Sequence, residues 1–208
     1  MCVIAVSPIG KRQPSQAELV SMWATNPHGA GYMCARRGKL YIHKGFMFLS
    51  DFLRAVRMEQ FTAADPVVYH FRIATSGGRS PEMTHPFPVA HDMVFEDCKL
   101  LDVSAPVGIA HNGVIPFCTI PKSEYSDTAI FTARYISQLI TDPSSIHNPE
   151  ITEFIVKNGG FSRFALMNRN GEIETIGDFT SVQGLLVSNT YYMHKVPTTV
   201  SKGWRVRA

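Results

Sequence analysis

The sequence lacks the features of a membrane-spanning or nucleic-acid-binding chain. None of its 208 residues forms part of a stretch approaching the ~18 consecutive apolar residues that a membrane-spanning helix needs. The apolar run near the start, residues 2–6, is too short for the core of a signal peptide. A large excess of charge of one sign is also missing, because the chain has 20 Lys and Arg and 17 Asp and Glu. These absences predict no membrane partner, no nucleic-acid partner and a cytoplasmic location.

The usual metal and nucleotide motifs are absent as well. The cysteines are widely spaced without a CxxC pair, which excludes a typical zinc site or disulfide framework and favours reduced thiols. They are Cys2, Cys34, Cys98 and Cys118. The histidines show no HxH or HExxH spacing, so we expect no metal, and we assign His70, His85, His91 and His111 to packing and loop hydrogen bonds. No GxxxxGK[ST], GxGxxG or GxSxG pattern occurs, and we expect no cofactor.

What the sequence does contain is enough apolar material for a core, at 45% hydrophobic residues over a length typical of one domain. We therefore expect a single domain over residues 1–208. Strands, two central helices and further strands follow one another, which predicts an α+β fold with stacked sheets rather than alternating βαβ units. Helices are expected from Ser15 to before Asn26, over 50–59, from Ser126 to 140 and over 150–157. Strands are expected at 3–6, 31–35, 39–43, 66–74, 107–111, 114–115, 164–168, 172–176 and 184–187.

Cys2 is the first candidate for chemistry. Removal of Met1 would leave a cysteine with its own free α-amino group, so that nucleophile and base share one residue. An α-amino group titrates near ~7.7–8.0 and can take the thiol proton directly or through a water. The alternative is an ordinary small apolar residue at the start of a strand.

Asn112 and Gly113 are candidates for an oxyanion hole. The amide of Asn112 and the backbone N–H of Gly113 could both donate to a developing oxyanion. Taken alone, an Asn-Gly pair between β-type runs favours the alternative, a plain type I′ hairpin turn.

Arg72 and Asp127 are candidates for binding charged groups. Arg72 lies in an otherwise apolar and aromatic strand, where a guanidinium needs a carboxylate partner from the protein or from a ligand. Asp127 stands at a helix start, either as a first-turn acid or as a partner for an ammonium group.

In this order, the motifs resemble those of class II glutamine amidotransferases, which are N-terminal nucleophile hydrolases. The resemblance covers most of the chain, and its stronger elements run in register across about 125 residues. The stronger elements are Met1-Cys2 before a strand, NPHGAGY, HFRIATSGG, His85-Pro86-Phe87, AHNGVI and Ser126-Asp127-Thr128. The weaker elements are Phe164-Ala165-Leu166, Gly171 and Ser188-Asn189. One departure is Val3, where the family usually has glycine.

The resemblance implies a four-layer αββα sandwich and a role for each candidate residue. Cys2 would be the nucleophile with its α-amine as base, and Asn112 and Gly113 would form the oxyanion hole. Arg72 would bind the α-carboxylate of a γ-glutamyl substrate, Asp127 its α-ammonium, and Thr75 would line the pocket.

The implied function is a stand-alone amidohydrolase that cleaves the γ-amide of glutamine or a related γ-glutamyl compound through a Cys2 thioester. Its ammonia would be released or passed to a separate synthase or acceptor protein. The alternative is a catalytically inactive binding or interaction module that retains the fold, and Met1 and Val3 are the features in its favour.

Overall fold

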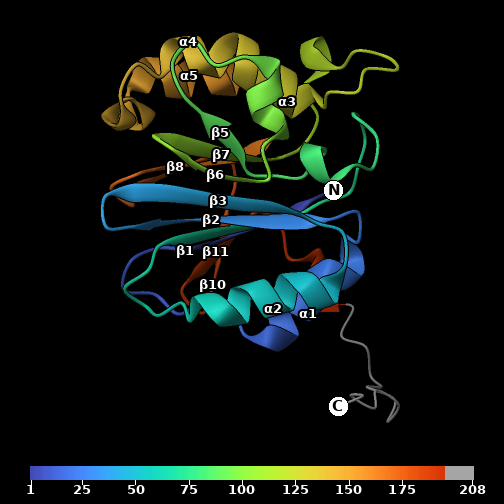
Figure 1. Cartoon of the computed structure of the whole chain (residues 1–208), viewed down its shortest axis with the longest axis vertical. Helices are drawn as coiled ribbons and strands as arrows, with labels where there is room; N and C mark the ends of the chain where they lie inside the picture. Colours follow the sequence, from blue (N-terminus) through green and yellow to red (C-terminus); the bar gives the residue numbers. More distant parts are fainter. Residues whose placement is uncertain (195–208) are drawn as a thin grey trace.

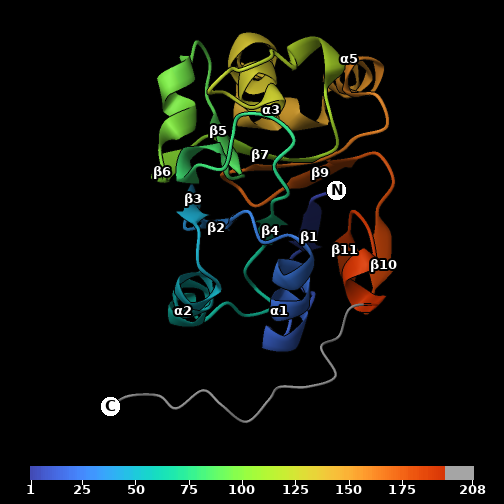
Figure 2. The ribbon, with the colours of Figure 1, turned by 90° about the vertical axis from the view of Figure 1, so that its right-hand side faces the viewer.

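Two antiparallel sheets lie face to face between two layers of helices in the computed structural model of the chain, which describes residues 1–194 (Figure 1). The larger sheet has the strand order β10-β11-β1-β4-β2-β3-β6, and the smaller has the order β5-β7-β8-β9. Helices α1 and α2 cover the outer face of the larger sheet, and α3, α4 and α5 cover that of the smaller (Figures 1 and 2). The predicted α+β class and αββα layering are therefore confirmed.

The bounds of the elements follow the expected order with small shifts at their ends. The strands are β1 (Val3–Ser7), β2 (Ala30–Arg36), β3 (Lys39–Phe46), β4 (Val67–Phe71), β5 (Phe87–Val89), β6 (Asp102–Ala105), β7 (Val107–Asn112), β8 (Arg163–Asn168), β9 (Ile173–Ile176), β10 (Thr180–Val182) and β11 (Leu185–Val187). The helices are α1 (Gln16–Thr25), α2 (Leu49–Glu59), α3 (Asp127–Phe131), α4 (Ser137–Leu139) and α5 (Pro149–Gly159). The structure joins α3 to α4 by a π-helical turn, Thr132–Ile136, within the one helix expected to end at residue 140.

Strand β1 shows how the sequence builds the layers. Val3 and Ala5 pack in the apolar core between the larger sheet and helices α1 and α2. Ile4 and Val6 point the other way, into the core between the two sheets. Successive side chains of a strand face opposite sides, so a strand buried on both faces needs a continuous apolar run. The central place of β1 between β11 and β4 fixes the residue before it, Cys2, at an end of the sandwich.

Helices α1 and α3 start at the two serines expected to begin them, and each serine caps its helix, whereas α2 starts after Phe48 without a side-chain cap. The Ser15 hydroxyl accepts a hydrogen bond from the Glu18 N–H, and the Glu18 carboxylate accepts one from the Ser15 N–H, which completes the capping box before α1. Ser126 likewise accepts from the Ala129 N–H at the start of α3. This cap places Asp127 in the first turn of α3, and Asp127 belongs to the site described below.

The hairpin expected around Asn112-Gly113 is wrong. Asn112 is the last residue of β7, which pairs with β5 and β8, and residues 114–115 form no strand. Glycine is required at 113 for another reason: a Cβ there would collide with the Ser162 side chain. The short strands β5, β6 and β10 also went unpredicted, because three or four residues give too little alternation to detect.

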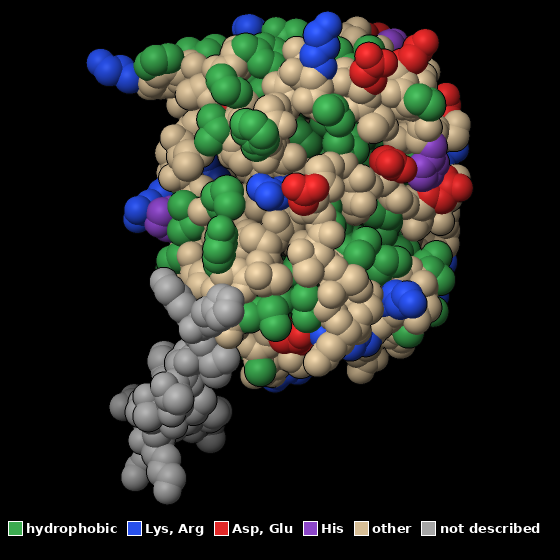
Figure 3. All heavy atoms as spheres, turned by 180° about the vertical axis from the view of Figure 1, so that it is seen from behind, with side chains coloured by type: hydrophobic (Ala, Val, Ile, Leu, Met, Phe, Trp, Pro, Cys, Tyr) green, Lys and Arg blue, Asp and Glu red, His purple; other side chains and the backbone are tan. Residues whose placement is uncertain are grey.

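The surface and the chain end add two observations. On the face seen in Figure 3, positive and negative side chains are interspersed without a continuous basic area. No helix within residues 1–194 is long and apolar enough to cross a membrane. The end of the expected 1–208 domain, residues 195–208, lies outside the described residues.

Lys44 is a buried cation that predicts a pH dependence of stability. It is 4% exposed, and its Nζ donates to the carbonyls of Glu82 at 2.7 Å and Cys98 at 2.6 Å and lies 4.0 Å from the ring centre of Phe87. Burial lowers the pKa of Lys44 to about 7. Between this pKa and the ordinary value of about 10.4, the unfolded chain binds a proton that the folded chain lacks, so stability rises with pH.

We expect the free energy of unfolding to increase between about pH 7 and about pH 8.5 by roughly 1–2 kcal/mol more in the wild type than in Lys44→Met. Urea unfolding at a series of pH values measures this difference. The exposed Lys39, replaced in the same way, is the control and should leave the wild-type slope intact. Parallel curves for the wild type and Lys44→Met would contradict the prediction.

Candidate active site

Cys2 is held at the entrance to β1 by contacts from two distant segments. Its Sγ accepts a hydrogen bond from the Ile73 N–H at 3.3 Å and lies 3.5 Å from the Ile73 carbonyl oxygen. Its own carbonyl accepts from the Asn189 side-chain amide at 2.7 Å. Met1 before it is 60% exposed, so the bond between Met1 and Cys2 lies at the surface.

Five of the six predicted site residues line one small pocket. They are Cys2, Arg72, Thr75, Gly113 and Asp127. Five further residues, which the sequence did not single out for the site, complete the lining: Ile73, Ser76, His85, His111 and Thr128. The free volume is about 10 Å³, which is room for about one water molecule.

The thiol of Cys2 is not activated by its surroundings alone. Burial raises the pKa of Cys2, and this effect outweighs the Ile73 hydrogen bond, the chain's amino terminus and Arg72, which act to lower it. A protonated thiol needs a base before it can attack a carbonyl. With Met1 in place the nitrogen of Cys2 is an amide, so its α-amine can serve as that base only after Met1 is removed.

Arg72 and Asp127 are both bound by the loop of residues 76–78. Nη1 of Arg72 donates to the Gly78 carbonyl at 2.7 Å and Nη2 to the Ser76 carbonyl at 2.7 Å. The Asp127 carboxylate accepts from the Ser76 hydroxyl at 2.9 Å and from the Ile115 N–H at 2.7 Å. Both side chains are at least 96% buried, and neither forms an ion pair with a described residue. The protein carboxylate considered as a partner for Arg72 is thus not found within residues 1–194.

Asn112 lies beside the pocket and is fully buried. Its Nδ2 donates to the Ser188 hydroxyl at 2.9 Å, while its Oδ1 has no partner among the described residues. Ser188 Oγ also accepts from the Ile4 N–H at 2.9 Å, so the same hydroxyl joins Asn112 to the strand that carries Cys2. The amide nitrogen has two hydrogens and uses one on Ser188, which leaves one for a ligand.

Three neutral histidines stack between the sheets next to the pocket. Ring centres are 4.2 Å apart for His70 and His85 and 6.3 Å apart for His85 and His111, and His111 stacks on Phe164 at 4.5 Å. Burial lowers the pKa of His70 to about 3, that of His111 to about 4 and that of His85 well below its usual value. These three histidines were expected to serve in packing, and His85 and His111 also line the pocket. No group of metal-binding side chains is found within residues 1–194.

Two details of the sequence acquire a meaning only in three dimensions. Val3, the departure from the resembling family, points into the core under α1 and α2 and not into the pocket. Ser188 and Asn189 were noted as weak elements of the resemblance, but their contacts with Asn112 and with the Cys2 carbonyl could not be read from the sequence. The only signal for them was the Ser-Asn pair directly after a short β-type run.

Comparisons with known proteins bear on the fold. No protein-family model matches the chain, and no curated protein matches its sequence. Among solved structures, the chain is similar to glutamine phosphoribosylpyrophosphate amidotransferase from B. subtilis, determined in complex with ADP and GMP, with a TM-score of 0.57 and 17% identity. The match covers 90% of this chain and 41% of that enzyme's chain, so this chain's counterpart is less than half of the enzyme. The chain therefore has the fold of the N-terminal nucleophile hydrolases to which the class II glutamine amidotransferases belong.

Proposed function

We propose that the chain hydrolyses the γ-amide of glutamine or a related γ-glutamyl compound through a thioester on Cys2. One observation carries the proposal: a thiol, a buried guanidinium and a buried carboxylate from three distant segments line the same pocket. A γ-glutamyl amide presents a scissile carbonyl, an α-carboxylate and an α-ammonium, and each has a complementary group here.

The substrate's charges would take over hydrogen bonds that the protein now makes to itself. The α-carboxylate would replace the carbonyls of Ser76 and Gly78 on the fork of Arg72. The α-ammonium would replace the Ser76 hydroxyl on Asp127. Because the pocket has room for about one water molecule, loop 76–78 must move to admit the substrate.

The chemistry then follows from the groups around Cys2. The α-amine of Cys2 takes the thiol proton, and the thiolate adds to the γ-carbonyl carbon. The N–H of Gly113 and the Asn112 amide donate to the oxyanion. Collapse of the tetrahedral intermediate breaks the C–N bond, and the leaving nitrogen takes the proton from the α-ammonium and departs as ammonia. Water activated by the same amine then hydrolyses the thioester to release the γ-carboxylate. The ammonia either enters solution or passes to a separate acceptor protein.

A second candidate is a non-catalytic binding or interaction module. It is favoured by the occupation of both charged side chains by the protein's own loop and by the small volume of the pocket. Such a module would need no free amine at Cys2. The two candidates therefore differ in what happens when that amine is released.

Two forms of the protein, one starting at Cys2 after cleavage of a fusion and one retaining Met1, distinguish these functions. A glutamine analogue with a diazo ketone in place of the amide should add one mass increment at Cys2 of the first form only, and glutamine should protect against it. Ammonia release from glutamine should follow the same division. If the form starting at Cys2 neither reacts nor releases ammonia, the hydrolase proposal fails and the binding module is favoured. Intact mass of protein from its native host shows which form occurs naturally.

Arg72→Lys is expected to lower kcat/KM for glutamine by roughly 10–100-fold, because an ammonium cannot reproduce the two parallel hydrogen bonds of a guanidinium. Arg54→Lys, on the exposed face of α2, is the control and should keep full activity. Initial rates of ammonia release measure both variants.

The same recognition scheme predicts that N-acetylglutamine is turned over far more slowly than glutamine, since it lacks the ammonium that Asp127 would bind. Equal turnover of the two compounds would refute this role for Asp127, even if Cys2 proved to be the nucleophile.

A further inference from the structure

The segment NPHGAGY, residues 26–32, lies beside the end of β4 that leads to the pocket. Its second half belongs to β2, which pairs with β4. Beyond the last strand pair, the Arg72 N–H donates to the Gly29 carbonyl at 2.8 Å, and the Arg72 carbonyl accepts from the His28 N–H at 3.0 Å. The backbone ladder between the two segments therefore extends past the ends of both strands.

His28 continues this ladder with its side chain. Its Nδ1 accepts a hydrogen bond from the Ala74 N–H at 3.0 Å. Two residues earlier the chain is already at Asn26, the C-cap of α1, so the backbone of this segment does not continue along the chain that follows β4. An imidazole nitrogen thus takes the place of the next backbone carbonyl.

The residue between these hydrogen bonds is Ile73, which contacts the thiol of Cys2. The Ile73 N–H donates to Sγ at 3.3 Å, and His28 holds the residue on each side of it, through the Arg72 carbonyl and the Ala74 N–H. Burial raises the pKa of Cys2, and the Ile73 N–H is the largest effect that acts against burial. The strength of a hydrogen bond depends on its length and angle, so the group that fixes this strand end also sets its effect on the thiol.

His28 accepts the Ala74 hydrogen bond only as a neutral imidazole. Burial lowers the pKa of His28, and the cations Arg79 and Arg72 lower it further. The neutral ring carries its proton on Nε2 and has the lone pair of Nδ1 for the Ala74 N–H. An imidazolium has a proton on both nitrogens and could not accept this bond.

We propose that His28 is a positioning residue for the Cys2 thiol, because its Nδ1 holds Ala74 and thereby keeps the Ile73 N–H directed at Sγ. The pocket lining found within residues 1–194 does not include His28, so it acts on the sulfur through the strand end alone. The consequence for catalysis rests on the proposed function, whereas the consequence for the reactivity of the thiol does not.

Alkylation of Cys2 by iodoacetamide at a series of pH values tests this role in the full chain that retains Met1. In that form the nitrogen of Cys2 is an amide, and the reagent reports the thiolate fraction without help from a base at the same residue. Peptide mass spectrometry separates the half-buried Cys2 from the buried Cys34, Cys98 and Cys118. The midpoint of the rate against pH measures how readily the thiolate forms.

His28→Ala should move this midpoint to higher pH and slow alkylation at about pH 7.5 by roughly 3–10-fold, because the Ile73 N–H is no longer held on the sulfur. His28→Asn should stay within about twofold of the wild type, since its Oδ1 stands where Nδ1 stood and accepts from the same N–H. His28→Gln carries the same amide one carbon further out and should behave like His28→Ala.

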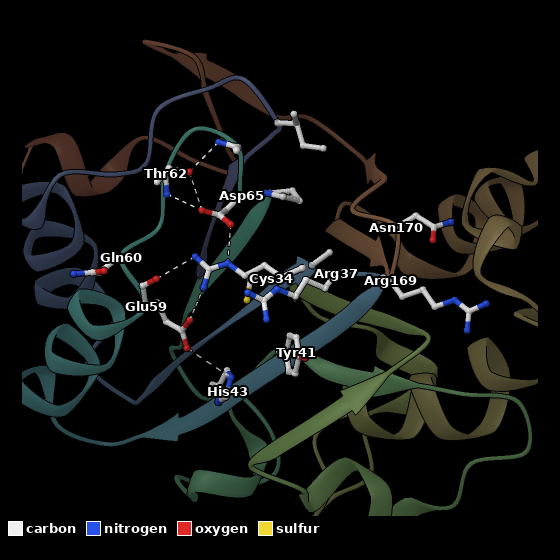
Figure 4. Close-up of a pocket in the computed structure, with 16 residues that line it drawn as sticks. Cys34, Arg37, Tyr41, His43, Glu59, Gln60, Thr62, Asp65, Arg169 and Asn170 are labelled. Atoms are coloured by element: carbon white, nitrogen blue, oxygen red, sulfur yellow. Dashed lines mark hydrogen bonds and ion pairs between the residues drawn. The ribbon is translucent and has the colours of Figure 1, made fainter.

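A histidine elsewhere supplies the matched control. His43 lies on the wall of a separate cavity, 4.0 Å from the Glu59 carboxylate (Figure 4). His43→Asn makes the same substitution at that distant place and should leave the midpoint for Cys2 unchanged.

An unchanged midpoint in His28→Ala would overturn the proposal, and so would equal midpoints in His28→Asn and His28→Gln. Unfolding temperatures are measured beside the rates. Where His28→Ala is destabilised, the comparison of the Asn and Gln variants decides, because both keep a polar amide and differ only in where its oxygen lies.

Ammonia release by the form starting at Cys2 is recorded separately from alkylation. No release from glutamine by the wild type would refute the hydrolase proposal and leave the role of His28 to the alkylation curves. Release by the wild type with identical alkylation curves in all His28 variants would refute the positioning role alone.

Discussion

Replacement of Cys2 by alanine is expected to abolish ammonia release from glutamine while leaving the fold intact. The side chain precedes β1 and contributes one weak pair of contacts with Ile73, so its loss should barely change the unfolding temperature. Its loss removes the only atom proposed to bond covalently to the substrate. Ammonia release by the form starting at residue 2, compared between variant and parent, measures the effect.

The other cysteines provide matched controls for this experiment. Burial raises the pKa of Cys34 and Cys98 to about 12 and that of Cys118 to about 11, so all three are protonated thiols at neutral pH. Their alanine variants should retain activity and the diazo-ketone label. Activity that survived in Cys2→Ala and vanished in one of these three would assign the nucleophile elsewhere.

Asn112→Ala is expected to lower kcat by roughly 10²–10³-fold with little change in KM, because the amide would donate to the oxygen only as negative charge develops on it. The buried carboxamide uses one hydrogen on Ser188, and the other would remain for the proposed oxyanion. Steady-state kinetics with glutamine separate the two parameters. Asn112→Asp should be as poor, since a carboxylate would repel the oxyanion.

A structural role for Asn112 would give a different pattern. If the residue served only to hold Ser188 and the strand of Cys2, then Ser188→Ala would reproduce the loss of kcat together with a lowered unfolding temperature. We expect Ser188→Ala to cost stability but to reduce kcat much less than Asn112→Ala. Near-normal turnover in Asn112→Asp would remove Asn112 from the oxyanion hole.

The sequence was sufficient for the elements with a strong local pattern. The helix starts at Ser15 and Ser126 and the strands over 31–35 and 39–43 each depend on residues close in sequence, and each is found where expected. The hairpin turn predicted at Asn112-Gly113 is not found, because the same dipeptide suits two different structures. Local rules assign it to a hairpin, whereas Ser162, 49 positions later, requires a glycine for close approach.

The candidate site also has one part that the sequence predicts and another that it does not. Cys2, Arg72, Thr75, Gly113 and Asp127 could be named because their residue types and order resemble a known set of motifs, and they line one pocket. The groups that support them are found only in the folded chain. The histidine stack forms from β4, the loop before β5 and the end of β7, and no spacing in the sequence brings those three segments together.

If Arg72 and Asp127 bind the proposed substrate, the hold of loop 76–78 on both side chains would make this segment a tethered competitor of that substrate. A competitor attached to the chain has a fixed effective concentration, so its occupancy of the site does not depend on the protein concentration. The apparent affinity for the proposed substrate, glutamine, would then be the intrinsic affinity multiplied by the fraction of molecules with the loop displaced. Gly77 sits against Ser126 with a φ of 66° and has no space for a Cβ. A bulkier residue at this position would shift the population toward the displaced loop and raise the apparent affinity without any new contact to the substrate.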